Sequence, residues 1–503
     1  MPALTSAIRY HARLAPDRLA LIYGGARITY AQLCARAEHT AGLLSARGIA
    51  KGDVVAVLMK NSAAFIEIAL AVSHAGAIFL PINFRLAADE VGYILEHSGA
   101  RLLLVDDELE KSAGSFAPRV VVSADAQSDS RLLAGNAARL ERAAALAQDD
   151  LFRLMYTSGT TDRPKGVMHT YDNYYWKCLD HIVSLGIGSM ERLLVVGPLY
   201  HVGAFDLPGL AVLLAGGTLC VQREFDPQAV LEAIHRERLT GGWMAPVMLN
   251  MVLTCPGRER YDLQSFRWLI GGGERTPEQR IRDFGGLFRD GRYIDAYGLT
   301  ESCSGDTLME PGMEIAKIGS VGRAVPHVEI EVRDDSGKAL PAGTRGEICL
   351  RGPKVTKGYW HDPERTAASF FGDWFRTSDI GYLDPDGFLY LTDRKKDMII
   401  SGGENIASSE VERVVYGLPQ VSEVAVIGLP DEKWGERVVA VVVLNAGAQL
   451  SSEELQRHCR AQLAGFKVPK QLIVRDTLPR NPSGKVLKRV LRDELARSSR
   501  SEQ

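Results

Sequence analysis

Short apolar runs alternate with helix-like stretches over the first 150 residues of the chain. The runs at 54–58, 77–81 and 102–105 consist entirely of apolar residues, many of them β-branched or aromatic. Each run has the length of a strand, and each intervening segment is long enough for a helix. Continuous apolar strands joined through helices are typical of a parallel sheet that is covered on both faces. The pattern therefore predicts an α/β fold.

The pattern changes further along the chain. Apolar and charged residues alternate at 328–332, and the Asp-Pro-Asp-Gly segment at 384–387 is typical of a hairpin turn. These features predict a small antiparallel sheet or barrel. The charged run at 393–397 is the candidate hinge. We therefore expect one domain at 1–396 and a smaller, mobile domain at 397–503.

Composition excludes several classes of protein. A chain of 503 residues is too long for a single core, so more than one domain is expected. The formal net charge of −3 gives no basis for binding nucleic acid. The seven cysteines are scattered without a Cys-x-x-Cys pair, which indicates reduced thiols and a cytoplasmic protein.

No stretch has the pattern of a signal peptide or a membrane span. The N-terminus lacks a basic region followed by a long apolar core. The longest apolar region, at 64–80, is interrupted by Glu67 and His74. This favours a core helix followed by a buried strand over a transmembrane segment. Peripheral association with a membrane is left open, as is the choice between monomer and homodimer.

A polar loop at 156–166 follows an apolar, strand-like run and has the sequence YTSGTTDRPKG. Hydroxyls and backbone N–H groups in such a loop can converge on phosphate oxygens, with Lys165 supplying a point charge. It is not a Walker A loop, because Lys165 precedes Gly166 and no Ser or Thr follows that glycine. Taken alone, the loop could also be a solvated polar turn.

Two further stretches place polar side chains at the ends of apolar runs. In one, Tyr297, Thr300 and Glu301 are suited to stack a base, bond a phosphate and hold Mg²⁺. In the other, the carboxylate of Asp379 is suited to ribose hydroxyls, and Arg394 follows as a fork-shaped donor for phosphate or ribose. Each of these residues also has a purely structural interpretation as a helix cap, a turn residue or half of a surface ion pair.

Five motifs recur in order over more than 300 residues. They are YTSGTT at 156–161, YGLTE at 297–301, TSD at 377–379, DR at 393–394 with IISGGEN at 399–405, and PSGK at 482–485. Together they resemble the AMP-forming acyl-CoA synthetases of the ANL superfamily of adenylate-forming enzymes, which also contains peptide-synthetase adenylation domains and firefly luciferase. The chain looks most similar to the stand-alone fatty-acyl-CoA ligases and to the feruloyl- or coumaroyl-CoA ligases.

The resemblance implies a fold and a reaction. The fold is a large N-terminal domain of doubly wound mixed sheets with a small β-barrel-like subdomain, followed by a small α+β domain on a hinge. In the reaction, a carboxylic acid attacks the α-phosphate of ATP in the presence of Mg²⁺, which gives an acyl-adenylate and pyrophosphate. The thiol of coenzyme A (CoA) then displaces AMP. The implied partners are therefore a small carboxylic acid, ATP and CoA.

The resemblance also implies the nucleotide site. Tyr297 would stack on adenine, and Thr300 would bond the α-phosphate. Thr160 and Glu301 would hold magnesium. Lys485 would lie between the carboxylate and the phosphate during adenylation, where a cation lowers their repulsion. The residues implied for ATP and AMP are Thr157, Ser158, Gly159, Thr160, Thr161, Lys165, Gly272, Gly273, Glu274, Asp295, Ala296, Tyr297, Gly298, Thr300, Asp379, Arg394 and Lys485.

The second half-reaction is implied to depend on the mobile domain. Rotation about a hinge at Lys396 would withdraw Lys485 and present Gly403 in its place. Because Gly403 has no side chain, it would leave room for the pantetheine arm. The implied contacts to CoA are Gly402, Gly403, Trp434 and Phe466.

The implied acyl site surrounds His201, whose ring would help to gate entry. His201 joins Lys485 and Thr300 as the residues assigned a catalytic role, although a core histidine satisfied by a backbone group is the alternative. The lining contains no obvious buried cation for a second carboxylate, which favours an apolar or aromatic monoacid over malonate; Arg275 leaves this open. The implied lining is His201, Phe205, Trp243, Met244, Pro246, Gly271 and Ser302.

Three departures from the family pattern are present. Asp162 replaces a glycine of the phosphate loop and adds negative charge there. Glu274 and Arg275 replace a more usual Ala-Pro, and Ala407-Ser408 replaces Tyr-Pro. Two other functions stay under consideration: an adenylating enzyme that loads the thiol of a carrier protein, and a nucleotide-binding regulator that has lost catalysis.

Overall fold

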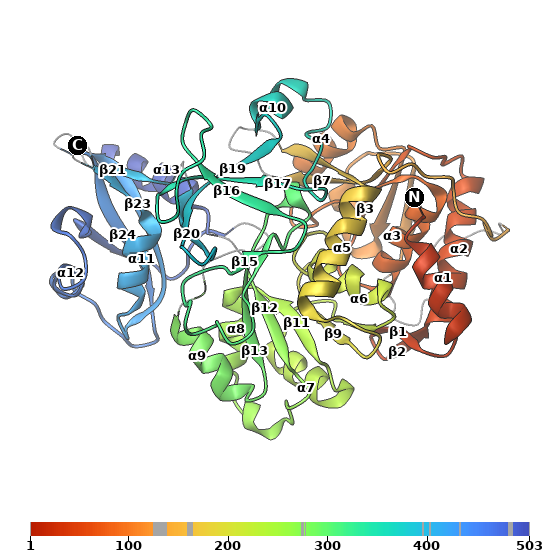
Figure 1. Ribbon diagram of the computed structural model, residues 1–503, viewed down its shortest axis with the longest axis horizontal. Coiled ribbons are helices and arrows are strands. Elements are labelled where there is room, and N and C mark those ends of the chain that lie inside the picture. Colours follow the sequence, from red (N-terminus) through yellow and green to blue (C-terminus); the bar gives the residue numbers. More distant parts are fainter. Residues whose placement is uncertain are drawn as a thin grey trace. The chain divides into compact units, whose positions relative to one another are not determined.

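The computed structural model describes residues 2–123, 138–157, 164–272, 276, 278–394, 397–401, 404–431, 434–480 and 486–501 (Figure 1). The chain forms two compact units. The first contains Met1–Glu329 and Leu350–Phe375, and the second contains Ile330–Cys349 and Arg376–Gln503. The predicted boundary at residue 396 is the hinge about which the smaller domain is expected to rotate. Compact units are defined by their internal contacts and do not test a hinge, so this boundary stays a prediction.

The first unit contains a six-stranded sheet in the order β6-β5-β3-β4-β7-β8. All neighbours pair in parallel except the β7–β8 hairpin at one edge. The parallel sheet predicted from the apolar runs is therefore confirmed. The strands are β3 (Val54–Leu58), β4 (Ile78–Pro81), β5 (Leu102–Asp106), β6 (Arg119–Val122), β7 (Leu151–Thr157) and β8 (Lys165–Thr170).

A nine-stranded sheet completes the first unit, in the order β15-β14-β13-β12-β11-β9-β10-β1-β2. Its centre is parallel, while β2 at one edge and β14 and β15 at the other pair antiparallel, so the sheet is mixed as expected. The strands are β1 (Leu19–Tyr23), β2 (Ala26–Thr29), β9 (Arg192–Val195), β10 (Thr218–Val221), β11 (Gly241–Met244), β12 (Trp268–Gly271), β13 (Arg292–Tyr297), β14 (Thr307–Leu308) and β15 (Arg323–Ala324).

Helices cover both sheets of the first unit. Every residue of α3 is buried, as predicted for a core helix, and the Ser62 hydroxyl caps it by accepting from the Phe65 amide. Thr170 caps α5 in the same way. The helices are α1 (Thr5–Leu14), α2 (Tyr30–Ala46), α3 (Ala63–Ala75), α4 (Ala88–Ser98), α5 (Tyr171–Leu185), α6 (Leu210–Leu214), α7 (Pro227–Glu237), α8 (Pro246–Leu253), α9 (Glu278–Leu287) and α10 (Pro363–Ala368). Short helical turns lie at η1 (Asp107–Ala113), η2 (Phe205–Gly209), η3 (Arg258–Arg260) and η4 (Thr300–Ser302).

A five-stranded sheet, in the order β16-β17-β19-β18 with β20 beside β19, occupies most of the predicted antiparallel region. The hairpin turn expected between β19 and β20 is present, since the Gly387 amide donates to the Asp384 carbonyl and Gly387 has a φ of +82°. The strands are β16 (Glu329–Arg333), β17 (Gly346–Arg351), β18 (Phe370–Phe371), β19 (Trp374–Leu383) and β20 (Leu389–Arg394).

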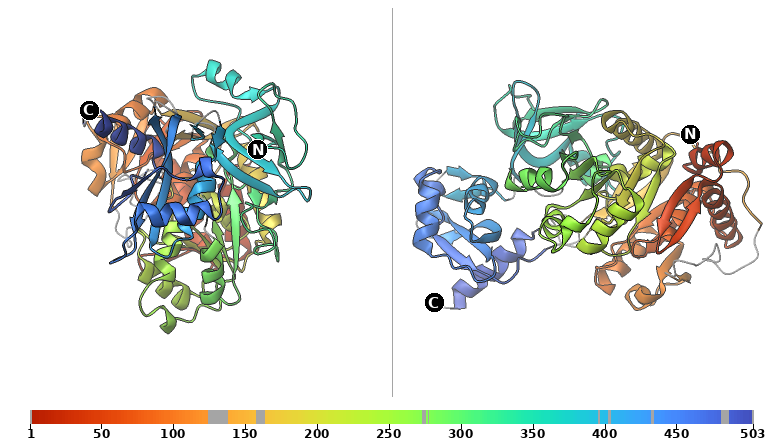
Figure 2. Two further views of the ribbon diagram at one scale, coloured as in Figure 1. Left: turned by 90° about the vertical axis from the view of Figure 1, so that its left-hand side faces the viewer. Right: turned by 90° about the horizontal axis from the view of Figure 1, so that it is seen from below.

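A second five-stranded sheet forms the C-terminal part of the second unit, in the order β22-β21-β24-β23 with β25 beside β24. Alternate residues of β23 and β24 point into two cores, one shared with α11 and α12 and the other with α13. A capping box between Ser451 and Glu454 opens α12. These elements, coloured blue in Figure 2, are β21 (Ile399–Ser401), β22 (Glu404–Ile406), α11 (Ser408–Tyr416), β23 (Val421–Asp431), β24 (Gly435–Leu444), α12 (Ser452–Arg460), η5 (Gly465–Lys467), β25 (Gln471–Val474) and α13 (Lys488–Ser501).

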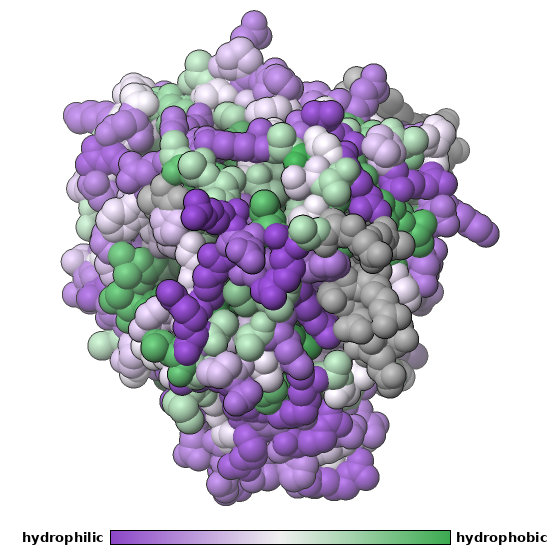
Figure 3. All heavy atoms as spheres, turned by 90° about the vertical axis from the view of Figure 1, so that its right-hand side faces the viewer, coloured by the Kyte–Doolittle hydropathy of each residue, from purple (hydrophilic) through white to green (hydrophobic). Residues whose placement is uncertain are grey.

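None of the helices in the described part of the chain is both long enough and apolar enough to cross a bilayer. The face of the molecule drawn in Figure 3 is mostly hydrophilic, with hydrophobic side chains in small separate areas. Scattered apolar residues of this kind are usual on protein surfaces.

Candidate nucleotide-binding site

The hairpin of β7 and β8 carries the predicted phosphate loop between its strands. Thr157 and Lys165 are the antiparallel pair at its end, so the loop starts and finishes at one point. The Thr157 hydroxyl is buried and has no hydrogen-bond partner among the described residues, which leaves it available to a ligand. The loop itself lies outside the described residues and includes Ser158, Gly159, Thr160, Thr161 and Asp162.

Lys165 reaches a carboxylate from the next predicted motif. Its Nζ donates to Glu301 Oε1 over 2.8 Å and to the Tyr359 hydroxyl over 2.7 Å. The Tyr359 hydroxyl in turn donates to Glu301 Oε1 over 2.9 Å. The side chains of Lys165 and Glu301 are 21% and 11% exposed, so the ion pair is within reach of solvent. The fold thus joins the phosphate-loop lysine to the carboxylate expected to hold magnesium.

Magnesium fits this arrangement. Proteins usually hold Mg²⁺ through one or two carboxylates together with waters and the phosphates of a substrate, without an all-protein cage. Glu301 offers one such carboxylate beside the phosphate hairpin. Over the described ranges, no cluster of three or more His, Cys, Asp and Glu side chains forms a cage of its own. The other expected ligand, Thr160, lies outside the described residues.

The carboxyl ends of β12 and β13 carry the residues expected around adenine. A Cβ added to Gly272 would lie 3.0 Å from the Ala296 carbonyl oxygen, and one added to Gly298 would lie 2.3 Å from the Gly305 nitrogen. Close packing of the backbone therefore accounts for both glycines. Gly273 and Glu274 lie outside the described residues. The described residues at these ends are Gly271, Gly272, Asp295, Ala296, Tyr297 and Gly298.

Thr300 begins η4 and is anchored through its backbone. His169 Nε2 donates to the Thr300 carbonyl oxygen over 2.6 Å, and Arg153 donates to His169 Nδ1 over 3.0 Å. Burial, with a smaller effect of the Arg153 charge, lowers the pKa of His169 to about 3. His169 is therefore neutral at physiological pH, and its two bonds fix the tautomer. The chain Arg153–His169–Thr300 holds the backbone next to Glu301 in place.

Three buried cations contact segments that are predicted to line the acyl site, and each has a partner within the protein. The prediction that no cation is available there for a second carboxylate stays a prediction. Arg153 Nη2 is 2.7 Å from Asp206 Oδ2, and Lys177 Nζ donates to the Asp206 carbonyl oxygen over 2.6 Å. Lys354 Nζ is 3.1 Å from Asp306 Oδ1. All five side chains are fully buried. The sequence conceals these groups because each cation is distant along the chain from its carboxylate, and only folding brings them together.

The cations around Asp206 determine its ionisation. Burial alone would raise the pKa of Asp206, but the charges of Arg153 and Lys177 outweigh it, so the pKa is lowered. The Tyr174 hydroxyl donates to Asp206 Oδ1 over 2.5 Å. Ser302, a predicted lining residue, donates its hydroxyl to Asp306. Both buried carboxylates are thus committed to neighbours within the protein.

The predicted acyl lining is closely packed. The Trp243 indole lies between Gly197 and Gly203, because a Cβ on either glycine would come within 2.6 Å or 2.8 Å of the ring. The Gly203 amide donates to His201 Nδ1 over 3.2 Å, and burial lowers the pKa of His201 to about 4. That bond is the one expected of a core histidine, and a gating role stays a prediction. The other predicted lining residues within the first unit are Phe205, Met244, Pro246, Gly271 and Ser302.

The predicted ribose pair lies in the second unit. Asp379 of β19 is directly opposite Arg394 of β20 in the antiparallel register. The Thr377 hydroxyl accepts from the Asp379 amide over 3.1 Å and donates to the Ile348 carbonyl over 2.8 Å. Ser378 between them has a φ of +61°, an uncommon value for a residue with a side chain. The two residues that the sequence assigns to one sugar are therefore neighbours.

The residues predicted to serve the second half-reaction are only partly described. Trp434 and Phe466 in the second unit are 44% and 40% exposed, which is unusual for large aromatic side chains. The other four lie outside the described residues and are Lys396, Gly402, Gly403 and Lys485.

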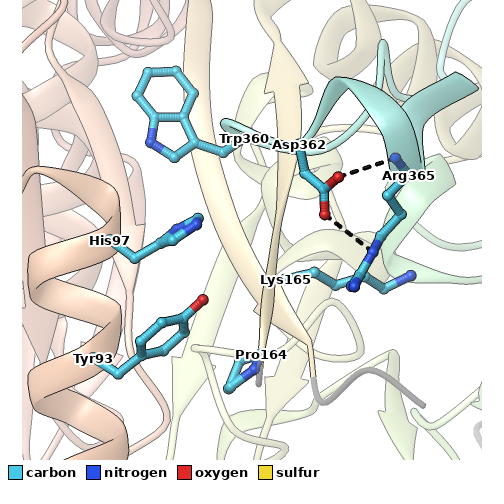
Figure 4. Close-up of a pocket in the computed structure, with 7 residues that line it drawn as sticks. All are labelled: Tyr93, His97, Pro164, Lys165, Trp360, Asp362 and Arg365. Carbon is cyan, nitrogen blue, oxygen red and sulfur yellow. Dashed lines mark hydrogen bonds and ion pairs between the residues drawn. The ribbon is translucent and has the colours of Figure 1, made fainter. Parts of the chain in front are cut away.

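A small pocket opens beside the phosphate hairpin (Figure 4). Tyr93, His97 and Trp360 lie one above another on the side of α4. Arg365 on the opposite side is held by Asp362, with 3.1 Å between Nε and Oδ2. The pocket gives a ligand access to the start of β8. Its lining residues are Tyr93, His97, Pro164, Lys165, Trp360, Asp362 and Arg365.

Comparison with known proteins agrees with the motifs. Residues 8–360 match the model of the AMP-binding enzyme family, and 410–485 match that of the AMP-binding enzyme C-terminal domain. A feruloyl-CoA synthase of Amycolatopsis sp is 39% identical over 483 residues, covering 95% of this chain and 96% of that protein. The long-chain-fatty-acid–CoA ligase FadD13 of Mycobacterium tuberculosis is 40% identical over 480 residues, covering 93% of each chain.

The fold agrees as well. The structure of o-succinylbenzoate CoA synthetase (MenE) from Bacillus subtilis, in complex with its acyl-adenylate intermediate, is 34% identical. The match has a TM-score of 0.87 and covers 97% of this chain and 98% of that one. The resemblance and the fold class inferred from the sequence are both confirmed. The chain belongs to the AMP-binding enzyme family and, within it, to the AMP-forming CoA ligases.

Proposed function

We propose that the protein activates an apolar or aromatic carboxylic acid, such as a fatty acid or a hydroxycinnamate, as its acyl-adenylate and transfers it to CoA. The observation that carries the proposal is the meeting of Lys165 and Glu301 at the phosphate hairpin. One residue comes from the predicted phosphate loop and the other from the predicted metal and adenine motif, which lies more than 130 residues away along the chain.

The buried charges support a monoacid. A second carboxylate on the substrate would need a cation without a partner, because burying an unpaired charge is costly. Arg153 and Lys177 already share Asp206, and Lys354 is paired with Asp306. The relatives named for feruloyl-CoA and long-chain fatty acids are consistent with an aromatic or an aliphatic monoacid.

In the proposed first half-reaction, the chain binds and orients ATP. Lys165 and the Thr157 hydroxyl contact the β- and γ-phosphates, Tyr297 stacks on adenine, and Thr300 bonds the α-phosphate. Asp379 would hold the ribose together with its strand neighbour Arg394. Glu301 holds magnesium, which when bound neutralises phosphate charge. Lys485 stabilises the negative charge that develops as the carboxylate attacks the α-phosphorus, which is electrostatic catalysis by a positioned cation.

In the proposed second half-reaction, rotation about Lys396 replaces Lys485 with the face that bears Gly403. The thiol of CoA attacks the acyl carbonyl, the acyl–phosphate bond breaks, and AMP leaves. The exposed rings of Trp434 and Phe466 support a contact to the nucleotide of CoA. The proposal includes a cytoplasmic location, which is supported by seven cysteines that are all free and buried.

The test is a panel of carboxylates assayed for release of pyrophosphate from ATP and then for release of AMP on addition of CoA. We expect pyrophosphate release with a hydroxycinnamate or a fatty acid, little with malonate, and AMP release that requires CoA. Release of AMP only with a carrier protein would favour the carrier-loading alternative. Tight ATP binding without pyrophosphate release for any acid would favour a regulator.

A further inference from the structure

We propose that Tyr359 is a positioning residue that holds Glu301 and Lys165 for binding of magnesium and ATP. The proposal rests on the proposed function for the identity of the ligand, but its evidence is independent. No motif in the sequence points to Tyr359, and it becomes visible only through its contacts. Its hydroxyl accepts from Lys165 Nζ at 2.7 Å and donates to Glu301 Oε1 at 2.9 Å, while the tyrosine is only 4% exposed.

The phenol matches the chemistry of both partners. A hydroxyl offers one donor and two acceptor sites, so it can accept from an ammonium group and donate to a carboxylate at the same time. The Lys165 ammonium also lies 4.1 Å from the centre of the Tyr359 ring, which is a favourable cation–π distance. Lys165, Glu301 and Tyr359 thus close a ring of three hydrogen bonds, in which each group contacts the other two.

The backbone around Tyr359 is hydrogen-bonded to both segments that carry the charged pair. Within 356–360, the Thr356 amide donates to the Glu301 carbonyl over 2.7 Å, and the Trp360 amide donates to the Gly166 carbonyl over 2.8 Å. Tyr359 itself forms an antiparallel bridge with Val167 of β8. The segment therefore binds η4, which carries Glu301, and β8, which carries Lys165. Its position fixes the spacing between the two charged residues.

The next turn fixes the tyrosine. The Tyr359 amide donates to the Thr366 hydroxyl over 3.0 Å. Gly358 has a φ of +136°, and a Cβ at this position would lie 2.3 Å from the Thr366 methyl group. Only glycine allows this approach to α10 without strain. The backbone of Tyr359 is therefore held by α10, and its hydroxyl is held by the charged pair.

This geometry gives the Tyr359 hydroxyl a role when Lys165 and Glu301 separate to bind a ligand. When a triphosphate enters, Lys165 can turn from Glu301 to a phosphate oxygen, because the pair is partly exposed. Glu301 then loses a cation before it gains a metal ion. The Tyr359 hydroxyl keeps a hydrogen bond to the carboxylate through this change, and a charge-assisted bond of this kind is stronger than a neutral one. Loss of the hydroxyl should therefore weaken binding of the metal-bound nucleotide more than it slows the chemical step.

The test is Tyr359→Phe, with Tyr175→Phe as the matched control, since the Tyr175 hydroxyl contacts only N-terminal carbonyl oxygens in the described structure. We measure binding of ATP with Mg²⁺ by calorimetry, without acid or CoA, and the KM for ATP and kcat of pyrophosphate release. For Tyr359→Phe we expect a dissociation constant and KM about 10- to 100-fold higher, with a smaller change in kcat. Tyr175→Phe should match the wild type in both.

A double-mutant cycle separates positioning from general damage. In a Glu301→Gln background, Tyr359→Phe should weaken ATP binding by less than about threefold, because the charged acceptor has already been lost. Additive losses in the cycle, or unchanged ATP binding in Tyr359→Phe, would overturn the proposal. If the wild type releases no pyrophosphate with any acid while this binding pattern holds, the proposed function fails and the role of Tyr359 stands.

Discussion

Two clusters in the first unit are built from the same three groups: a cation, a carboxylate and a tyrosine. In the accessible cluster, Lys165 pairs with Glu301 and lies 4.1 Å from the centre of the Tyr359 ring. In the buried cluster, the Arg153 guanidinium pairs with Asp206 and lies 4.9 Å from the centre of the Tyr174 ring. The chemistry is alike, and the surroundings differ.

Exposure decides what each cluster can do. Both side chains of the Arg153–Asp206 pair are fully buried, whereas those of the Lys165–Glu301 pair are partly exposed. A buried charge that loses its partner has no water to replace it, so the buried pair is locked. The exposed pair can exchange one partner for a ligand at low cost. A binding site needs a partly exposed pair such as Lys165–Glu301, and a buried pair such as Arg153–Asp206 can support it.

The clusters are also connected. Arg153 of the buried cluster donates to His169, and His169 donates to the carbonyl of Thr300, the residue before Glu301. The locked pair therefore supports the backbone from which the exchangeable carboxylate projects. The comparison predicts that mutations in the buried cluster act on stability and mutations in the accessible cluster act on the reaction.

The largest expected effect is that of Asp206→Asn on stability. The substitution leaves Arg153 and Lys177 buried without a carboxylate, so the free energy of unfolding should fall by about 3–5 kcal/mol. Urea unfolding followed by circular dichroism measures the change. The double variant Asp206→Leu with Arg153→Met removes the strongest unpaired charge and should recover part of the loss. A change below about 1 kcal/mol in Asp206→Asn would show that the buried pair is not locked.

The converse change is Glu301→Gln in the accessible cluster. Because the pair is partly exposed, the free energy of unfolding should change by no more than about 1 kcal/mol. Pyrophosphate release should nevertheless fall about 100- to 1,000-fold, since the carboxylate proposed to hold magnesium at the phosphates loses its charge. Glu329→Gln is the matched control, because Glu329 forms a surface pair with Arg351 and should leave activity unchanged. Equal activity in both variants would contradict the assigned role.

A smaller effect is expected when the tyrosine of the buried cluster loses its hydroxyl. Tyr174→Phe removes a donor to the buried Asp206 carboxylate, which should reduce the free energy of unfolding by about 1.5–3 kcal/mol. The KM for ATP should not change. Tyr359→Phe should show the opposite pattern, with altered ATP binding and nearly unaltered stability. The two substitutions are chemically identical, so similar outcomes would remove the distinction between the clusters.

The sequence predicts the local features of this molecule well and its long-range contacts poorly. The apolar run at 54–58 became β3, the turn at 384–387 joins β19 to β20, and Asp379 lies opposite Arg394, because each depends on neighbouring residues or on a hairpin. The buried cations were missed because Arg153 lies in an otherwise apolar strand and its partner Asp206 is 53 residues away. Burial of charge depends on the packed fold and not on local pattern.

Tyr359 is a residue of the candidate site that the sequence did not predict, for the same reason. It lies in no motif that suggested chemistry, and its value comes from contacts to Lys165 and Glu301, which are 194 and 58 residues away. Its neighbour Gly358 was the available signal, since an isolated glycine before an aromatic residue can mark a close approach of the backbone. Glycine alone does not identify the partners, so the structure was needed.

The smallest expected effect is the pH dependence of stability that His169 contributes. Its pKa is about 3 in the folded protein and about 6.5 when unfolded, so below pH 6.5 the unfolded chain binds a proton that the folded chain does not. Stability is therefore fully present above pH 6.5 and is lost as the pH falls toward 3, with a slope of about 1.4 kcal/mol per pH unit from this group. Asp206, whose pKa is lowered, adds its own loss only below the ordinary aspartate range. Urea unfolding at pH 7, 6 and 5 should show the slope in the wild type and a flatter one in His169→Gln. Parallel slopes would mean that His169 is not held neutral between Arg153 and Thr300, and the link between the two clusters would be lost.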